Sequence, residues 1–376
     1  MSAIPPKETQ EKSSLYIMAK HLRPFISTEK MTILLAAVSL LYVIYMCETL
    51  NRLDKENTKS KRNRYLMIDV DNPFAVIVDN SQDTLISIGG KQFNTLVTPS
   101  TACKSDRIRN VIIIVTSPLE VHARSVVRHS WVSDLLKDNA TIGYFFLIGS
   151  EDENWNPEHQ AEHYKDILSF NVNYRTQNTT ELVLLGLQWV MQNCQSIKHI
   201  TKVHGDIFVN THQLSTLIYS LPDSKFMGGK CVGTSKPNRN KVSPFYVPFR
   251  EYKKELYPPM CSTSAYIMSV DLVQKILQAL RDVPYFRLED VFIGHLLLHL
   301  GITPRNIVNF LTDQFHEGNC DITKDVLFLH EADIDHINIL WRHFIRCDLT
   351  FTKSNKNFVL EFSQLKNFSG TFQNDH

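Results

Sequence analysis

The chain has 376 residues, of which 43% are hydrophobic, enough for one large or two ordinary domains with a sizeable core. Its 40 Lys and Arg residues are balanced by 39 Asp and Glu residues. The chain therefore has no excess of basic residues of the kind that nucleic acid binding requires, and we expect no nucleic acid partner.

The first distinctive segment is the uncharged stretch MTILLAAVSLLYVIYMC at residues 31–47. A helix of this length spans roughly 25 Å, which is adequate for a thin bilayer. A buried core helix or a cleaved signal peptide would also be apolar. However, a long polar stretch precedes the segment and no small-residue cleavage site follows it. We predict an uncleaved transmembrane signal anchor at residues 31–47, preceded by a cytoplasmic tail at residues 1–30.

Two features of the sequence, the charge bias and the glycosylation sequons, predict opposite orientations for this anchor. More Lys and Arg residues follow the apolar segment than precede it, and charge bias alone would place the C-terminal side in the cytoplasm. Three glycosylation sequons favour a luminal C-terminal side instead, at Asn139, Asn178 and Asn367. We therefore expect a single-pass type II membrane protein.

Cysteines agree with this luminal placement. Six of them lie after the apolar segment, an even number that an oxidising compartment would allow to pair, although the sequence leaves the pairing open. None of the six falls in a C-x-x-C spacing, which disfavours a zinc site. We interpret Cys261 as a disulfide partner rather than a nucleophile, since no histidine stands beside it in a recognisable arrangement.

Residues 48–104 begin with the charged run ETLNRLDKENTKSKRNR, which is typical of a solvated stem. β-rich patches such as DTLISIGG follow within it. From residue 108 onward, buried strands alternate with amphipathic helices. The predicted strands are NVIIIVTS, TIGYFFLIGS and HITKVHGDIFVN, and the predicted helices are LEVHARSVVRHSWV, TTELVLLGLQWVMQNC, SVDLVQKILQAL and EDVFIGHLLLHLG, the last closing on Gly301.

This alternation predicts an α/β domain on a mostly parallel sheet, in which ligands lie outside the carboxyl ends of the strands. Asp206, in KVHGDIFVN, is at such an end. Glu289 and Asp290 open a predicted helix, where acidic residues also make good caps. Arg124 and Arg128 share one helix face, which is either a solvated face or a place for phosphate oxygens.

Several of these segments, in this order, resemble one family. They are HARSVVRHSW, YFFLIGS, HYKDILSFNVNYRTQNTTELVLLGLQWVMQNC, KVHGDIFVN, YVPFREYKKELYPPMCSTSAYIMS and LEDVFIGHLLLHLGITP. Over about residues 108–347 the chain resembles the β-1,3-galactosyltransferase and β-1,3-N-acetylglucosaminyltransferase family of type II Golgi enzymes. The resemblance implies a luminal glycosyltransferase domain at residues 105–376, with one Rossmann-like nucleotide-sugar-binding fold of the GT-A type.

The resemblance also implies the reaction: inverting, β-1,3-linked transfer of galactose or an N-acetylhexosamine from a UDP-sugar to a glycan on protein or lipid. Asp206 matches the last Asp of the family's D-x-D motif, which binds Mn²⁺ on the donor diphosphate, and His330 matches a family histidine that returns to the metal. A surface histidine is the alternative for His330. His204 and Gly205 depart from the D-x-D pattern. One carboxylate and one imidazole can suffice as protein ligands, because diphosphate oxygens also coordinate Mn²⁺.

Asp290 matches the family's general base, which an inverting transfer needs to deprotonate the acceptor hydroxyl. Arg124 and Arg128 match arginines near the nucleotide. The replaced carboxylates in HGD raise a second hypothesis, a catalytically silent relative that binds glycans or escorts another transferase. Retention of Asp206, Asp290 and His330 opposes it.

Overall fold

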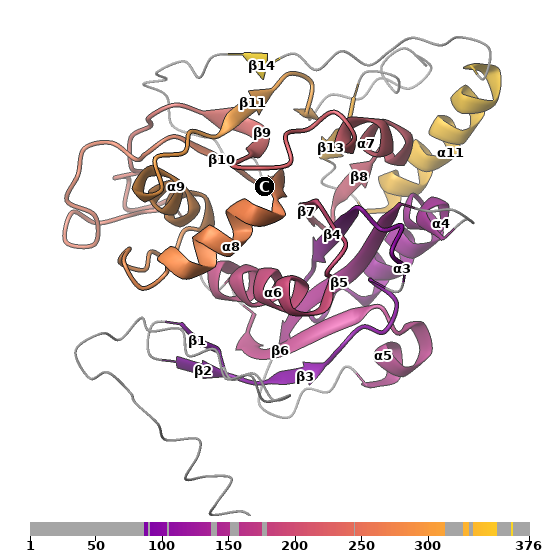
Figure 1. Ribbon diagram of the computed structural model, residues 1–376, viewed down its shortest axis with the longest axis horizontal. Coiled ribbons are helices and arrows are strands. Elements are labelled where there is room, and N and C mark those ends of the chain that lie inside the picture. The colour runs from indigo at the N-terminus through magenta and orange to yellow at the C-terminus, as the bar shows by residue number, and fades with distance from the viewer. Residues whose placement is uncertain are drawn as a thin grey trace, which may run out of the picture. The chain divides into compact units, whose positions relative to one another are not determined.

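The computed structural model describes residues 86–88, 91–103, 105–136, 141–150, 158–174, 179–243, 245–312, 326–330, 334–351 and 362–363 (Figure 1). Contacts divide the chain into residues 1–69 and 70–376, and the described residues all belong to the second unit. The predicted tail, the anchor at 31–47, most of the stem and the three sequons lie outside the described residues. Within the described part, none of the helices has the length and hydropathy needed to cross a bilayer.

The described residues form a main sheet in the order β14-β11-β9-β10-β7-β4-β5-β6-β3. Its strands in chain order are β3 (Thr95–Val97), β4 (Asn110–Val115), β5 (Ile142–Ser150), β6 (Ile167–Asn173), β7 (His199–His204), β9 (Met227–Val232), β10 (Met260–Ser269), β11 (Arg305–Ile307) and β14 (Phe362–Ser363).

Strand direction in this sheet differs from the prediction of a mostly parallel sheet. The central strands β7, β4, β5 and β6 pair in parallel, as do β9 and β11, whereas β10 is antiparallel to both its neighbours and the edge strands β3 and β14 are antiparallel to theirs. The sheet is therefore mixed. The strands expected from the sequence, β4, β5 and β7, do pair in parallel with one another, and the antiparallel pairs in this sheet all involve β3, β10 or β14, which were not expected.

The segment HITKVHGDIFVN was expected to be one strand, and this expectation was wrong. It contains two strands, β7 and β8 (Ile207–Val209), separated by a turn at Gly205 and Asp206. β8 leaves the main sheet and joins β12 (Leu311–Thr312) and β13 (Phe328–His330) in a small sheet. Asp206 therefore lies where the chain passes from one sheet to the other.

Helices cover both faces of the main sheet (Figure 1). They are α3 (Val121–His129), α4 (Val132–Leu135), α5 (Glu158–Tyr164), α6 (Thr179–Asn193), α7 (Thr211–Ile218), α8 (Val270–Ala279), α9 (Glu289–His299) and α11 (Ile334–Phe351). The four predicted helices are confirmed as α3 with α4, α6, α8 and α9. Gly301 follows α9 with a positive φ of 65°, a conformation that glycine adopts without strain.

Alternate residues of β4 enter two separate cores. Val111, Ile113 and Val115 pack with residues of α6, α8 and α9, whereas Ile112 and Ile114 pack with residues of α3, α4, α7 and α11. The molecule thus has three layers, with the sheet in the middle. Because both faces of β4 are covered, its sequence is continuously apolar rather than alternating. The predicted α/β class is confirmed.

The ordered domain extends into the segment that the sequence assigned to the stem. A hairpin of β1 (Ile86–Ile88) and β2 (Lys91–Phe93) falls there, and β3 pairs with β6 of the main sheet. Two disulfides join Cys103 to Cys194 and Cys231 to Cys261, which confirms Cys261 as a disulfide partner. Cys347 is also disulfide-bonded. For the part of the predicted stem that precedes β1, the assignment as a stem stays a prediction.

Candidate active site

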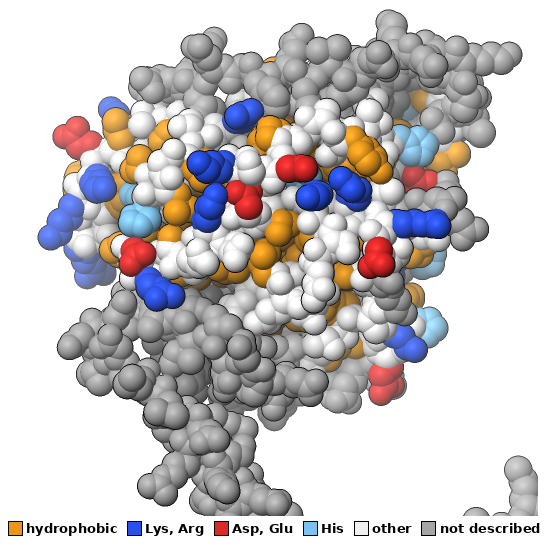
Figure 2. All heavy atoms as spheres, viewed as in Figure 1, with side chains coloured by type: hydrophobic (Ala, Val, Ile, Leu, Met, Phe, Trp, Pro, Cys, Tyr) orange, Lys and Arg blue, Asp and Glu red, His pale blue; other side chains and the backbone are white. Residues whose placement is uncertain are grey.

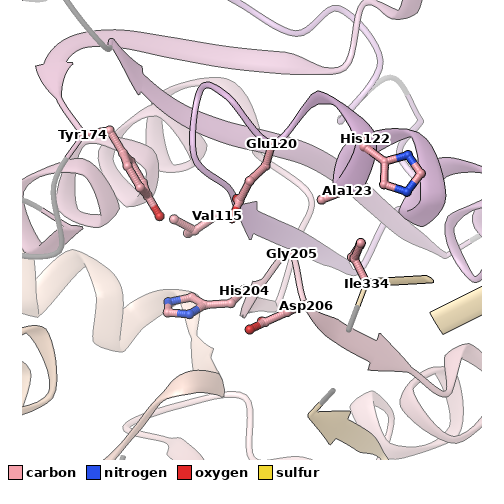
Figure 3. Close-up of a pocket in the computed structure, with 9 residues that line it drawn as sticks. All are labelled: Val115, Glu120, His122, Ala123, Tyr174, His204, Gly205, Asp206 and Ile334. Carbon is pink, nitrogen blue, oxygen red and sulfur yellow. The ribbon is translucent and has the colours of Figure 1, made fainter. Parts of the chain in front are cut away.

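A cavity of about 430 Å³ opens at the carboxyl ends of β4 and β7, the place where ligands were expected (Figure 3). Figure 3 shows Tyr174 and Glu120 on one side of it and His204 and Asp206 on the other. The full lining is Val115, Glu120, His122, Ala123, Tyr174, His204, Gly205, Asp206 and Ile334.

Asp206 and His330, the two predicted metal ligands, lie side by side. The His330 Nε2 atom is 3.3 Å from the Asp206 Oδ2 atom. The antiparallel pairing of β13 with β8, which sets His330 opposite Ile207, produces this contact between residues far apart in sequence. The Asp206 Oδ1 atom is buried and makes no hydrogen bond within the described part of the chain. Asp206 therefore has one oxygen next to an imidazole and a second that is available to a ligand.

The charge state of Asp206 follows from its neighbours. Burial by itself would raise the pKa of this carboxyl group. The hydrogen bond from His330 and the charge of His204 outweigh burial and hold the pKa below its ordinary value. Asp206 is consequently a carboxylate at neutral pH, the form that a metal cation requires.

Gly205 at the centre of HGD is explained by packing. A Cβ atom at this position would collide with the Thr116 methyl group, which follows β4. The turn after β7 lies this close to β4 because the Gly205 N–H donates a hydrogen bond of 2.9 Å to the Val115 carbonyl. A larger residue here would require the buried Thr116 side chain to move.

A buried ion pair involves β7, the strand that ends at the cavity. Lys202 in β7 donates hydrogen bonds to the Thr263 carbonyl and, at 3.4 Å, to Glu289 Oε2, while the Tyr266 hydroxyl donates to Glu289 Oε1 at 2.8 Å. The Lys202 and Glu289 side chains are 0% and 2% exposed. Burial lowers the pKa of Lys202 and raises that of Glu289, and their mutual attraction opposes both shifts. Glu289 is the first residue of α9, and its pairing with Lys202 therefore connects this helix to β7. Its role is not limited to capping the helix.

Asp290, the predicted general base, is next to this pair at the start of α9. The Val291 N–H donates a hydrogen bond of 2.8 Å to Asp290 Oδ1. Burial, with the nearby charge of Glu289, raises the pKa of Asp290 to about 6. Burial lowers the pKa of Lys202, and the charges of Asp206 and Asp290 both oppose that shift, so the two predicted site residues lie within electrostatic range of one ammonium group.

Arg124 and Arg128 do not line the cavity and are bound to protein groups. The buried Arg124 guanidinium donates to the Ser117 carbonyl at 2.6 Å and the Pro118 carbonyl at 2.9 Å, and burial followed by the charge of Arg128 lowers its pKa to about 10. Arg128 donates two hydrogen bonds to Asp166, of 2.8 and 2.9 Å. Arg124 thus holds the loop that carries Glu120, and the predicted contact of both arginines with a nucleotide stays a prediction.

The comparisons with known proteins agree with this site. A family model described as galactosyltransferase matches residues 122–308. This chain belongs to the galactosyltransferase family. It is therefore a glycosyltransferase.

Three relatives illustrate the similarity. Mouse β-1,3-galactosyltransferase 5 is 27% identical over 213 residues, which cover 56% of this chain and 69% of that protein. Human β-1,3-galactosyltransferase 2 is 29% identical over 220 residues, 56% of this chain and 52% of that protein. Mouse β-1,3-galactosyltransferase 1 is 27% identical over 263 residues, 68% of this chain and 79% of that protein. A solved glycosyltransferase involved in glycosylation of the major capsid of PBCV-1 aligns over 62% of this chain and 98% of its own at 12% identity, with a TM-score of 0.34, and the assignment does not rest on it.

The galactosyltransferase match includes Asp206 and Asp290 but ends before His330, which only the fold brings to the site. Sequence reasoning did not single out Glu120, Tyr174 or Lys202. Lys202 could have been found, because the strand HITKVH contains no other Lys, Arg, Asp or Glu residue and a lysine inside a buried strand needs a partner. Tyr174 carries no such signal: it lines the cavity beside Glu120, and burial together with nearby carboxylates raises its pKa above the ordinary value.

Proposed function

We propose that this galactosyltransferase-family chain is an inverting β-1,3-glycosyltransferase. Its catalytic domain has the GT-A type of fold, and it moves galactose or an N-acetylhexosamine from a UDP-sugar to a glycan on a glycoprotein or glycolipid. The observation that carries the proposal is the pairing of Asp206 with His330 at the cavity, with Asp290 and its raised pKa at the adjacent helix start. A diphosphate-binding group and a base are the minimum that an inverting sugar transfer requires.

On the donor side, the residues present fit a divalent cation such as Mn²⁺. The buried Oδ1 atom of Asp206, without a hydrogen-bond partner in the described part of the chain, and the His330 imidazole are suitable oxygen and nitrogen ligands. The described residues contain no cluster of three or more His, Cys, Asp and Glu side chains that could hold a metal, so a cation held by Asp206 and His330 would need further oxygen ligands, which a diphosphate could supply. When bound, the cation neutralises charge on the leaving diphosphate.

On the acceptor side, Asp290 accepts the proton of the attacking hydroxyl group. Its pKa of about 6 makes it ionised near neutral pH and still basic enough to take a proton, because a general base works best when its pKa is close to the operating pH. Lys202 and Glu289 position Asp290 by holding the first turn of α9 against β7. Arg124 positions the loop that carries Glu120.

The silent escort hypothesis is not favoured by the comparisons, whose similar proteins are named as transferases. We also propose that the chain is a type II membrane protein of the Golgi. Residues 31–47 would anchor it, with the catalytic domain in the lumen. The downstream sequons support this placement, and the two disulfides support an oxidising compartment.

The test is calorimetric binding of UDP to the purified protein, with and without Mn²⁺, followed by a screen of UDP-sugars for transfer to a glycan panel. We expect metal-dependent UDP binding that Asp206→Ala abolishes and His330→Ala weakens. Asp223→Asn is the matched control, because Asp223 is an exposed carboxylate whose partner, Lys198, lies outside the cavity. Metal-independent UDP binding that survives Asp206→Ala would refute the donor-site assignment.

A further inference from the structure

The connection between β9 and β10 concentrates positive charge. We call residues 233–259 the basic loop. It contains six basic residues and two acidic ones, in a chain whose net charge is only +1. Figure 2 shows Lys and Arg side chains gathered at the left edge of the view, where Figure 1 draws this connection. The basic residues are Lys236, Arg239, Lys241, Arg250, Lys253 and Lys254, and the acidic residues are Glu251 and Glu255.

The basic loop is held in one conformation. The disulfide between Cys231 and Cys261 closes its base. Arg239 is only half-buried and donates hydrogen bonds to the carbonyl groups of Val247 and Tyr252, at 2.7 and 2.8 Å. These bonds tie distant parts of the loop together, so its charges are displayed on a preorganised surface.

The basic loop also lies next to the helix that carries the general base. Arg287, three residues before Asp290, donates to the Tyr246 carbonyl at 2.7 Å and to Glu251 at 2.8 Å. At the loop's other end, Tyr257 is close enough to Asp290 for the carboxylate charge to add to burial in raising the tyrosine pKa. The loop is therefore anchored near Asp290, the residue proposed to activate the acceptor hydroxyl.

The surface of the loop combines charge with an exposed aromatic ring. Phe249 is 66% exposed, and the Arg239 guanidinium lies 4.1 Å from its ring centre. Lys253 and Lys254 are exposed and adjacent, and Glu251, one of the two acids, is already paired with Arg287. An exposed aromatic ring with a guanidinium against it, on a loop that also carries two exposed lysines, suits a ligand that has an apolar face and a negative charge.

We propose that the basic loop binds the acceptor and that the acceptor glycan carries a negative group, a carboxylate or a sulfate, near the site of transfer. Sugar rings offer the apolar face that packs on an aromatic side chain, and the anionic group complements the lysines. This inference rests on the proposed function, because it assumes that Asp290 marks the acceptor side of the cavity.

The experiment compares matched acceptors. Neutral oligosaccharides and the same oligosaccharides with one sulfate or one uronic acid are tested for binding without donor and for transfer with UDP-sugar. We expect the anionic forms to bind at least about fivefold more tightly, with a preference that falls at high salt, because each exposed ion pair adds only modestly to affinity. Lys253→Gln with Lys254→Gln should remove most of the preference and leave UDP binding unchanged.

The matched control is Arg342→Gln with Arg346→Gln, which removes two exposed positive charges from α11 and should leave the preference intact. Equal binding of neutral and anionic glycans, or an equal effect of both double variants, would overturn the inference. Loop-dependent binding to vesicles containing anionic lipid, without any acceptor preference, would also overturn it and make the loop a membrane contact. If anionic glycans bind through the loop but no sugar is transferred, the loop inference stands and the proposed function fails.

Discussion

Replacing Asp290 with asparagine should abolish transfer and, at neutral pH, stabilise the fold. The pKa of Asp290 is raised from 3.8 to about 6. An acid with a raised pKa in the folded state contributes stability that is fully present below its unfolded pKa and is lost as pH rises through about 6. A shift of about two pKa units corresponds to about 3 kcal/mol in the free energy of unfolding.

Asp290 is partly exposed, so solvent screening reduces this figure, and we expect Asp290→Asn to be about 1–3 kcal/mol more stable than the wild type at pH 7.5. At pH 4.5 the wild-type carboxyl is largely protonated and the gain should become much smaller. Urea unfolding of both proteins at the two pH values measures this difference. In parallel, kcat should fall by at least about a hundredfold, the usual contribution of a general base, with UDP binding retained.

Asp271 in α8 provides a control, because its pKa is shifted in the opposite direction to that of Asp290. Asp271 has a lowered pKa, because hydrogen bonds from Ser269, Lys275 and the Lys225 backbone outweigh its burial. Asp271→Asn should therefore destabilise the fold at pH 7.5, and its effect should shrink as pH falls. If Asp290→Asn is less stable than the wild type at pH 7.5, or if its effect does not change with pH, then Asp290 is not held in the desolvated environment described above.

Three further changes test the architecture of the site. Lys202→Met should cost about 3–5 kcal/mol in urea unfolding, because it leaves Glu289 buried without its cation, and adding Glu289→Gln should recover part of that loss; additive effects would contradict the pairing. Gly205→Ala should cost about 1–3 kcal/mol through its collision with the Thr116 methyl group, and an unchanged melting temperature would show that the threonine side chain moves aside without cost. Arg128→Lys keeps the charge but loses the two-point hydrogen bond to Asp166, so a loss of about 1–3 kcal/mol is expected by thermal unfolding, whereas a neutral outcome would mean that charge alone suffices.

The sequence by itself determined the class of the fold and most of its helices and central strands. β4 and β5 are continuous apolar runs because helices cover both faces of the sheet, and this burial is visible in the residue pattern. Asp206 and Asp290 could also be selected from sequence, since Asp206 follows a predicted strand, Asp290 opens a predicted helix, and both stand in motifs that match the family.

Only the tertiary structure decided which distant residues meet. His330 contacts Asp206 because β13 pairs with β8, and Lys202 meets Glu289 because α9 packs on β10, the neighbour of β7 in the sheet. The break of the predicted third strand at Gly205 likewise depends on a contact with β4. Periodicity reports only how exposed a residue is, whereas strand direction, register and ion pairing are chosen by the free energy of the whole packed chain.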